Sequence, residues 1–494
     1  MIAKKKLLLL TIFLLVTIFS FWKKGQHDLQ EWDESRNGVN AYEMLQNHDF
    51  VNLYYNGEVD TWNAKPPLMI WMIAGSYKIF GYNEFALRFP ATLSIIVFFM
   101  LCFVIIRLLE DDLTAFLTCL ILISCKAIFG NHVGLTGDFD APLLVFLTAS
   151  VYTFILYVEK QKKYAILITS IFTGLAFYTK GPASLVLVPG FLLFILLRKK
   201  TELFKDVRLW VSAAIFILIA GSWLLIASMY GKTSNHSYYG SKNSVETMLV
   251  YDTFQRLSNS KFDNQTHESD YMFFFEVIDA RLNLWNYLFY LSLLAGIYKL
   301  YKMRRSFSNF INAEQHLMLL LSMCLILPLS LVLTVASSKN NWYLAPLYLF
   351  IAFITAKGIL FFERKWRPFY LITGCLLVFN MGRQLYYIYT LPTEFHDKLS
   401  HNADLKNNTV FFTEAINQNV LLYLKWLGVS LVHKDTLDEI AMEQGKLAYV
   451  HLKTQTEIFP KNVVKVVQLN NYFLLKISDS GSSSVKESSK LYFR

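Results

Sequence analysis

Acidic and basic side chains recur at the boundaries of long apolar segments. The carboxylates Asp33 and Glu34 follow the first such segment, and Asp138 and Asp140 precede a later one. Further polar candidates occupy similar boundaries: Arg36, Lys65, Lys180, Arg256, His267, Lys339 and Tyr343. A carboxylate can take a proton from an attacking hydroxyl group, and lysine or arginine can hold an anion as its charge develops. If folding brings these residues together, they suit proton transfer beside a bound anion.

Each of these residues also has a purely structural interpretation. Asp33 and Glu34 could cap an interfacial helix, and Asp140-Ala141-Pro142 fits a helix start with proline just inside. Lys65 could lie in a proline turn and extend its amine to the membrane interface, and Lys339 could anchor the chain at headgroup level. The combination, in its order and spacing, favours a functional site more than any single residue does.

The composition shows what kind of fold must position these residues. Of the 494 residues 54% are hydrophobic and only 17% are charged, which is typical of a membrane protein rather than a water-soluble one. The net charge is +10, but the basic residues lie between apolar runs and not on one water-facing domain, so the charge does not indicate nucleic-acid binding. All five cysteines fall inside apolar runs, which excludes a disulfide framework and a CxxC metal site. The chain is therefore predicted to be a polytopic membrane protein.

About eleven apolar runs are long enough to cross a bilayer core of about 30 Å as helices. They are residues 7–22, 90–106, 113–130, 141–158, 164–180, 182–197, 209–229, 283–301, 316–336, 342–362 and 368–388. The first run follows three lysines, as a signal peptide would, but Ser20-Phe21-Trp22-Lys23-Lys24 is no small-residue cleavage site. We therefore expect a retained first helix and a mainly α, helical-bundle fold.

Lysine and arginine in short loops predict the orientation, because such loops stay in the cytoplasm. With the N-terminus inside, every loop assigned to the cytoplasm carries positive charge: Arg107; Lys160, Lys162 and Lys163; Arg198, Lys199, Lys200, Lys205 and Arg208; Lys299, Lys302, Arg304 and Arg305; Arg364, Lys365 and Arg367. The short loops on the opposite side hold one cation each at most. An odd number of spans then places the region after about residue 391 outside.

Three predicted outer segments are too long to be simple turns: 23–89, 230–282 and 391–494. The first reads as partly helical and interfacial, since it is rich in tyrosine and tryptophan. Residues 391–477 mix strand-like and helical runs, which predicts a small outer α/β domain after a membrane domain of residues 1–390. The serine-rich tail 478–494 is predicted to be disordered.

Several motifs, taken in order, resemble those of the GT-C membrane glycosyltransferases, in particular the aminoarabinose (lipid A) transferase and protein O-mannosyltransferase-like group. The motifs are Trp32-Asp33-Glu34-Ser35-Arg36, Tyr42-Glu43-Met44-Leu45, Lys65-Pro66-Pro67-Leu68, Gly137-Asp138-Phe139-Asp140-Ala141-Pro142, Thr179-Lys180-Gly181-Pro182 and Ser338-Lys339 with Trp342-Tyr343-Leu344-Ala345-Pro346. They cover about residues 1–390, and the set is specific although each motif alone is weak. The resemblance implies a bacterial inner-membrane enzyme whose active site and C-terminal domain face the periplasm.

The resemblance also implies a reaction and roles. In that group a sugar passes with inversion from a polyprenyl phosphate to an acceptor hydroxyl, which needs one displacement and one base. Asp33 resembles the catalytic acid of the first loop, with Glu34 as a possible substitute, while Asp140 and Asp138 resemble a second acidic landmark that orients the acceptor or positions Lys180. The candidates to hold the departing phosphate are Lys65, Arg256, Lys339 and Tyr343; Arg36 and His267 are further site candidates.

Two departures from the group's pattern affect what can be expected of metal binding and of the acceptor. Members that modify lipid A often carry an acid directly before the first-loop lysine, where this chain has Ala64, and the stretch Asp252 to Arg256 lacks the expected Glu-His or Glu-Asn start. Transfer without a metal or other cofactor is therefore the expectation, and the acceptor stays open between lipid, glycan and protein. A protein O-mannosyltransferase-like enzyme and a transporter are the alternatives, although the chain shows no internal repeat of the kind many transporters have.

Overall fold

The computed structural model describes residues 2–234, 243–255, 272–302, 310–311, 313–336, 339–400, 402–403, 405–412, 415–434, 439, 447–451, 463–469 and 472–477. The chain divides into two compact units, the first made of residues 1–25 and 40–391 and the second of residues 26–39 and 392–494. Each unit is described by itself. The predicted tail 478–494 lies outside the described residues.

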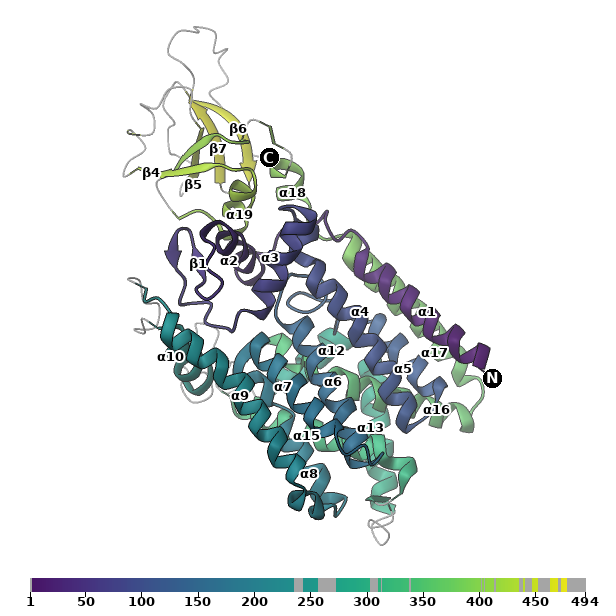
Figure 1. Cartoon of the computed structure of the whole chain (residues 1–494). Coiled ribbons are helices and arrows are strands. Elements are labelled where there is room, and N and C mark those ends of the chain that lie inside the picture. Colours follow the sequence, from purple (N-terminus) through teal and green to yellow (C-terminus); the bar gives the residue numbers. More distant parts are fainter. Residues whose placement is uncertain are drawn as a thin grey trace. The chain divides into compact units, whose positions relative to one another are not determined.

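The first unit is a helical bundle (Figure 1). Among its described residues, five helical segments are long and apolar enough to cross a membrane, or six if the bent pair discussed below is one span. The five are α4 (Glu84–Leu109), α6 (Asp140–Val158), α9 (Val207–Tyr230), and the segments Glu314–Val335 and Asn341–Lys365, which contain α15 (Leu317–Val335) and α16 (Tyr348–Lys365). Further helices are α1 (Ile2–Phe21), α5 (Asp112–Ile123), α7 (Ala165–Lys180), α8 (Val188–Leu197), α13 (Trp285–Lys302) and α17 (Phe369–Tyr389). A helix thus occurs at each of the eleven predicted positions, while the number of membrane crossings stays a prediction.

Segment 165–197, predicted as two crossings, contains α7 and α8, with a bend of 69° between Ala165–Leu185 and Val188–Leu197. Arg198 and Lys200, just after α8, pair with Glu159 at the end of α6, at N–O distances of 3.1 and 3.0 Å. Because α7 follows Glu159 and α8 precedes Arg198, the segment begins and ends at the same end of the bundle. These contacts favour a helical hairpin over a single bent crossing.

The predicted span 113–130 is too long, because α5 ends at Ile123 and a buried loop fills residues 124–139. Glycines allow this loop to pack tightly: a Cβ on Gly134 would lie 2.6 Å from the Ile128 carbonyl oxygen. The loop is also pinned by side chains, since Lys24 donates to the carbonyl oxygens of Gly134 and Leu135. The loop connects α5 to α6 and so fixes the residues just before Asp140.

The segment between residues 40 and 80 is another compact connection in the first unit. It contains the end of α2 (Asp33–Asn47), a two-stranded hairpin of β1 (Tyr54–Tyr55) and β2 (Glu58–Val59), and α3 (Leu68–Phe80). The buried Asn40 side chain donates to Tyr54 O at 2.7 Å and to Asp60 Oδ2 at 3.0 Å, and it accepts from Asn63 Nδ2 at 2.9 Å. This network holds the turn that leads to Lys65.

The second unit contains a five-stranded sheet in the order β4-β3-β5-β7-β6 (Figure 1). Its strands are β3 (Thr409–Phe412), β4 (Ser430–His433), β5 (Leu447–His451), β6 (Val463–Leu469) and β7 (Tyr472–Ile477). β3 is parallel to β4 and β5, whereas β7 is antiparallel to β5 and β6. Two short helices, α18 (Glu394–Leu399) and α19 (Gln418–Trp426), belong to the same unit, and so does the start of α2.

Candidate active site

A cavity of about 270 Å³ within the first unit gathers charged residues from distant parts of the chain. Its polar lining consists of Lys65, Asp140, Lys180, Asp252, Thr253 and Tyr343, and its apolar lining includes Leu329, Val332 and Leu333 of α15 together with Pro182 and Val186. One part of the cavity therefore suits an anion and another suits a hydrocarbon chain. Four of the residues proposed from sequence (Lys65, Asp140, Lys180 and Tyr343) meet here.

Asp140 and Lys180 form a close ion pair at the polar part of the cavity. Asp140 is the first residue of α6 and Lys180 the last of α7. The Lys180 ammonium donates to both carboxylate oxygens at 2.7 Å, and the two side chains are 15% and 8% exposed. Gly181 follows with a φ of +55°, a conformation that glycine adopts without strain and that turns the chain directly after the lysine. The pair thus joins two helices and partly neutralises both charges.

Lys65 reaches the cavity without a carboxylate partner among the described residues, because none of their carboxylates lies within 4.0 Å of its ammonium group. Its Nζ is 3.4 Å from Asn63 Oδ1 and 5.0 Å from the centre of the Phe139 ring. The Asn40 and Asp60 network described above holds Asn63. Lys65 is therefore a positioned cation whose charge, unlike that of Lys180, is not balanced by an ion pair.

Tyr343 and Asp252 complete the polar lining from other segments, and Trp342 also lines the cavity. Tyr343 belongs to η7 (Asn341–Leu347), a tighter helical turn before α16, and its hydroxyl accepts from Asn340 Nδ2 at 3.1 Å. Asp252 lies on η3 (Thr247–Gln255), which has the wide turns of a π-helix, a form that often marks functional sites. Sequence reasoning named Tyr343 as a candidate; it placed Asp252 in the second long outer loop but did not include it among the site residues.

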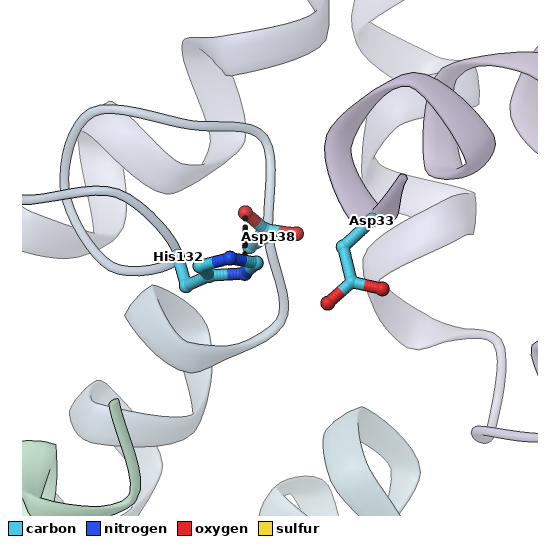
Figure 2. A group of neighbouring side chains, drawn as sticks. All are labelled: Asp33, His132 and Asp138. Atoms are coloured by element: carbon cyan, nitrogen blue, oxygen red, sulfur yellow. Dashed lines mark ion pairs between the residues drawn. The ribbon is translucent and has the colours of Figure 1, made fainter. Parts of the chain in front are cut away.

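His132 is a residue of this region that sequence reasoning missed. Its Nδ1 lies 3.6 Å from Asp138 Oδ2, and Figure 2 shows the ring beside that carboxylate. The Thr136 hydroxyl donates to the same oxygen, and the His132 ring stacks on Trp342 with the ring centres 3.7 Å apart. The sequence feature that could have identified His132 is its place as a polar residue in a glycine-rich loop before Asp138. Its contact with Trp342 could not be predicted, because the two residues are far apart in sequence.

The remaining candidates do not line the cavity as the structure describes it. Lys339 is buried next to η7 but is not among the lining residues. Arg256 and His267 lie outside the described residues. Asp33, which Figure 2 also draws, Glu34 and Arg36 belong to the second unit, at the start of α2. There, the buried Glu34 accepts a hydrogen bond from the Gln30 backbone at 2.8 Å.

The helical bundle, with its charged cavity at the helix ends, has the GT-C type of membrane-protein fold, as comparison with solved structures shows. The similarity extends over whole chains: the crystal structure of ArnT from Cupriavidus metallidurans bound to undecaprenyl phosphate has a TM-score of 0.67, covering 95% of this chain and 97% of that one at 13% identity. Its apo structure gives a TM-score of 0.65. This confirms the predicted fold.

Sequence comparisons point to the same group. Residues 64–226 match the family described as dolichyl-phosphate-mannose-protein mannosyltransferase, a stretch that contains Lys65, Asp138, Asp140 and Lys180. An uncharacterised protein of Aquifex aeolicus is 31% identical over 45% of this chain and 43% of its own. An undecaprenyl phosphate-aminoarabinose arabinosyl transferase of Pseudomonas fluorescens is 28% identical over 44% of this chain and 39% of its own. These findings confirm the predicted resemblance to GT-C glycosyltransferases of this group.

A putative mannosyltransferase of Bacillus subtilis, YkcB, is 26% identical over 51% of this chain and 35% of its own. The chain thus spans less than half the length of the curated relatives it matches here. The similar proteins therefore include a mannosyltransferase and an arabinosyl transferase, and the sugar of this chain does not follow from them.

Proposed function

We propose that the chain is an inverting glycosyltransferase that moves a sugar from a polyprenyl-phosphate donor to an acceptor at the outer face of the bacterial inner membrane. The observation that carries the proposal is the cavity where Lys65, Lys180, Asp140 and Tyr343 meet beside an apolar wall from α15. A lipid-linked phosphate needs both surfaces at once, one for its charge and one for its hydrocarbon chain. A solved protein of the same fold is described as bound to undecaprenyl phosphate, which supports this class of donor.

In this proposal the leaving phosphate is stabilised by Lys65. As the bond from the anomeric carbon to the phosphate oxygen breaks, the electron pair stays on that oxygen and its negative charge grows. A phosphate is already a weak base, so it leaves without taking a proton. Lys65 is suited to hold that charge, since no described carboxylate pairs with it. Lys180 contributes less, because Asp140 already balances its charge, and the Tyr343 hydroxyl is a further possible donor.

The acceptor hydroxyl needs a base to take its proton as it attacks. We assign this role to Asp33, with Glu34 as the alternative, from their resemblance to the first-loop acid of the group. Asp140 acts in this scheme as a positioning residue, since both its oxygens bind Lys180. One attack on the face opposite the leaving phosphate inverts the anomeric centre and needs no second catalytic carboxylate.

The nature of the sugar and of the acceptor is left open between several classes. The donor carries a hexosyl or pentosyl group, and the acceptor is a lipid, a glycan or a protein. The family match to protein mannosyltransferases favours a protein O-mannosyltransferase-like enzyme as the second candidate. Transfer without a metal remains the expectation, as does the placement of the C-terminal region outside the membrane.

A deletion strain tests the proposed function. Mass spectrometry of its outer-surface lipids, glycans and proteins should show the loss of one sugar modification, which the intact gene restores. The Asp33→Asn variant should insert normally into the membrane but fail to restore the modification, whereas Glu58→Gln, at an exposed acid of β2, should restore it. A deletion that changes no glycoconjugate would contradict the function. Full activity of the Asp33→Asn and Glu34→Gln double variant would contradict only the assignment of the base.

A further inference from the structure

Three cations gather outside the cavity, at the end of the bundle where α5 passes into the loop that precedes Asp140. They are Lys126 of that loop, Arg281 of α12 (Phe273–Leu282) and Arg383 of α17. None of the three lines the cavity. We call them the Lys126 cluster. The proposed transfer chemistry does not use them.

Contacts with α17 and with the loop define the surroundings of the Lys126 cluster. The Lys126 ammonium lies 3.9 Å from the centre of the Tyr387 ring on α17. One turn earlier on the same helix, Gln384 donates to the Phe129 carbonyl oxygen at 2.7 Å, which holds α17 against the loop. The Arg281 guanidinium packs directly against Gly130, because a Cβ on Gly130 would lie 2.2 Å from a guanidinium nitrogen. Lys126 and Arg281 therefore lie at one short stretch of chain, residues 126–130, and Arg383 is next in sequence to Gln384, which contacts the same stretch.

The cluster carries positive charge without a balancing carboxylate. Within the described parts of the chain, no Asp or Glu lies within 4.0 Å of any of the three cations. Partial burial, together with the charges of Arg383 and Arg281, lowers the pKa of Lys126. The charges of Arg383 and Arg281 thus act on the partly buried Lys126, and like charges repel one another unless an anion joins them. Without an anion, repulsion among the three cations destabilises the cluster, and a bound anion would remove that repulsion.

The surface around the cluster shows which anion would reach it. On α17, Phe379, Tyr386 and Tyr389 are 56%, 68% and 60% exposed, so this side of the helix presents large apolar side chains. On a helix of a membrane protein such a surface faces lipid, and tyrosines near its end are typical of the headgroup zone. Arg383 is itself exposed, between Phe379 and Tyr386. We therefore expect Arg383 to lie at the level of the lipid headgroups, with the exposed apolar side chains of α17 next to the acyl chains.

We propose that the Lys126 cluster binds the headgroup of an anionic phospholipid from the leaflet at the active-site end of the bundle. The phosphate would lie among the three cations and the acyl chains along the exposed side of α17. Basic pockets between membrane helices bind anionic headgroups in this way. Because Gln384 ties α17 to the loop that carries His132 and Asp138, the bound lipid would stabilise that loop. The proposal is independent of the sugar that is transferred.

Native mass spectrometry of the full-length protein in detergent tests this proposal. Dioleoylphosphatidylglycerol should bind more tightly than dioleoylphosphatidylcholine. Each cation near a membrane surface contributes about fivefold in affinity, so Arg383→Gln alone should weaken binding of the anionic lipid about fivefold and Lys126→Gln with Arg383→Gln about thirtyfold. The matched control is Lys162→Gln with Lys163→Gln, two exposed cations after α6, which should change little.

Folding is checked by the thermal unfolding of each variant without added lipid. Arg383 is exposed, so the single variant should keep the wild-type midpoint even if the double variant does not. Equal binding of the two lipids, or an unchanged affinity in Arg383→Gln, would overturn the proposal. Displacement of the lipid by millimolar inorganic phosphate would also overturn it, since the cluster would then be a site for a free anion and not for a lipid.

Discussion

Lys65 and Lys180 are both lysines of the same cavity, yet their surroundings predict different consequences of mutation. The ammonium of Lys65 has no carboxylate partner in the described chain, so it is free to bind a phosphate. A hydrogen bond to a charged group contributes about 1.5–3 kcal/mol. We therefore expect Lys65→Met to weaken the binding of undecaprenyl phosphate roughly tenfold to a hundredfold, measured with purified protein. Lys78→Met, at an exposed lysine of α3, is the control and should bind normally.

Lys180 should instead affect stability through its pairing with Asp140. Breaking a buried ion pair on one side leaves an uncompensated charge and costs about 3–5 kcal/mol. Lys180→Met and Asp140→Asn are therefore each expected to lower the midpoint of thermal unfolding. The double variant should be more stable than the sum of the two single effects predicts, because neither charge is left alone. Strictly additive losses would show that the 2.7 Å contact contributes no coupling.

At the residue scale, sequence reasoning named some of the residues that the structure brings together in the cavity. Lys65, Asp140 and Lys180 could be predicted because charged residues at the boundaries of apolar segments are costly and conspicuous. His132 was missed because its surroundings depend on Trp342, a contact between segments far apart in the chain. The apolar wall of α15 was also missed, since Leu329 and Val332 resemble every other residue of a membrane helix. Only packing distinguishes them.

At the scale of elements, the turn after α7 controls where Lys180 points. Gly181 has a φ of +55°, and a Cβ there would lie 2.9 Å from Met248 Sδ. Gly181→Ala should therefore lower stability by about 1 kcal/mol through backbone strain alone and shift Lys180 within the cavity. Thermal unfolding and binding of undecaprenyl phosphate measure the two effects. Met248 is buried, so Met248→Ala alone is the reference for the double variant. In that background the steric contact is gone but the strain remains, so Gly181→Ala should still lower the unfolding midpoint; no loss there would show that the backbone conformation is not strained.

A second element contact joins the loop after α2 to the end of α9 and predicts a dependence on pH. Lys232 donates to Asp49 Oδ2 at 3.0 Å and also to the Tyr54 hydroxyl. The hydrogen bonds to Tyr54 and Asp49 raise the pKa of Lys232 to about 12. Burial alone would raise the pKa of Asp49, but hydrogen bonds from the Asn52 backbone and from Lys232 lower it overall.

The pKa shifts of Asp49 and Lys232 both stabilise the folded state, each over its own range of pH. The contribution of Asp49 is present above the ordinary pKa of about 3.9 and is lost as the pH falls below it. That of Lys232 is present below about 10.4 and is lost as the pH rises through about 12. The difference in unfolding midpoint between wild type and Lys232→Gln should thus be constant from about pH 5 to 9 and shrink toward pH 3. A difference that instead grows on acidification would contradict the contact.

Element boundaries show what local sequence could not decide. The apolar run 113–130 predicts one long helix, but α5 stops at Ile123 because the following residues satisfy their backbone groups in a glycine-rich loop held by Lys24. In the C-terminal region the strands from Thr409, Leu447, Val463 and Tyr472 follow runs of β-branched and aromatic residues that could be read directly. β4 (Ser430–His433) was not predicted, since its pairing with β3 depends on the chain between them.

At the scale of the whole molecule, the pattern of positive charge predicts the orientation, and the structure adds one constraint. The ion pairs of Glu159 with Arg198 and Lys200 place the ends of α6 and α8 together. Lys162 and Lys199, both exposed, should therefore lie on the same side of the membrane, and the positive-inside rule makes that side the cytoplasm. Asn56, at the exposed tip between β1 and β2, should lie on the opposite side.

Single-cysteine labelling decides this orientation in intact cells. The background is Cys375→Ser, because Cys375 is exposed whereas Cys102, Cys119, Cys125 and Cys324 are buried. In that background, a membrane-impermeant maleimide should label Asn56→Cys from outside but should label Lys162→Cys and Lys199→Cys only after the cells are opened. Labelling of Lys199→Cys alone from outside would make α7 and α8 a single bent crossing. Because every helix after α8 would then reverse its direction, the two faces of the later loops would be exchanged, and the proposed outer-face site could not form.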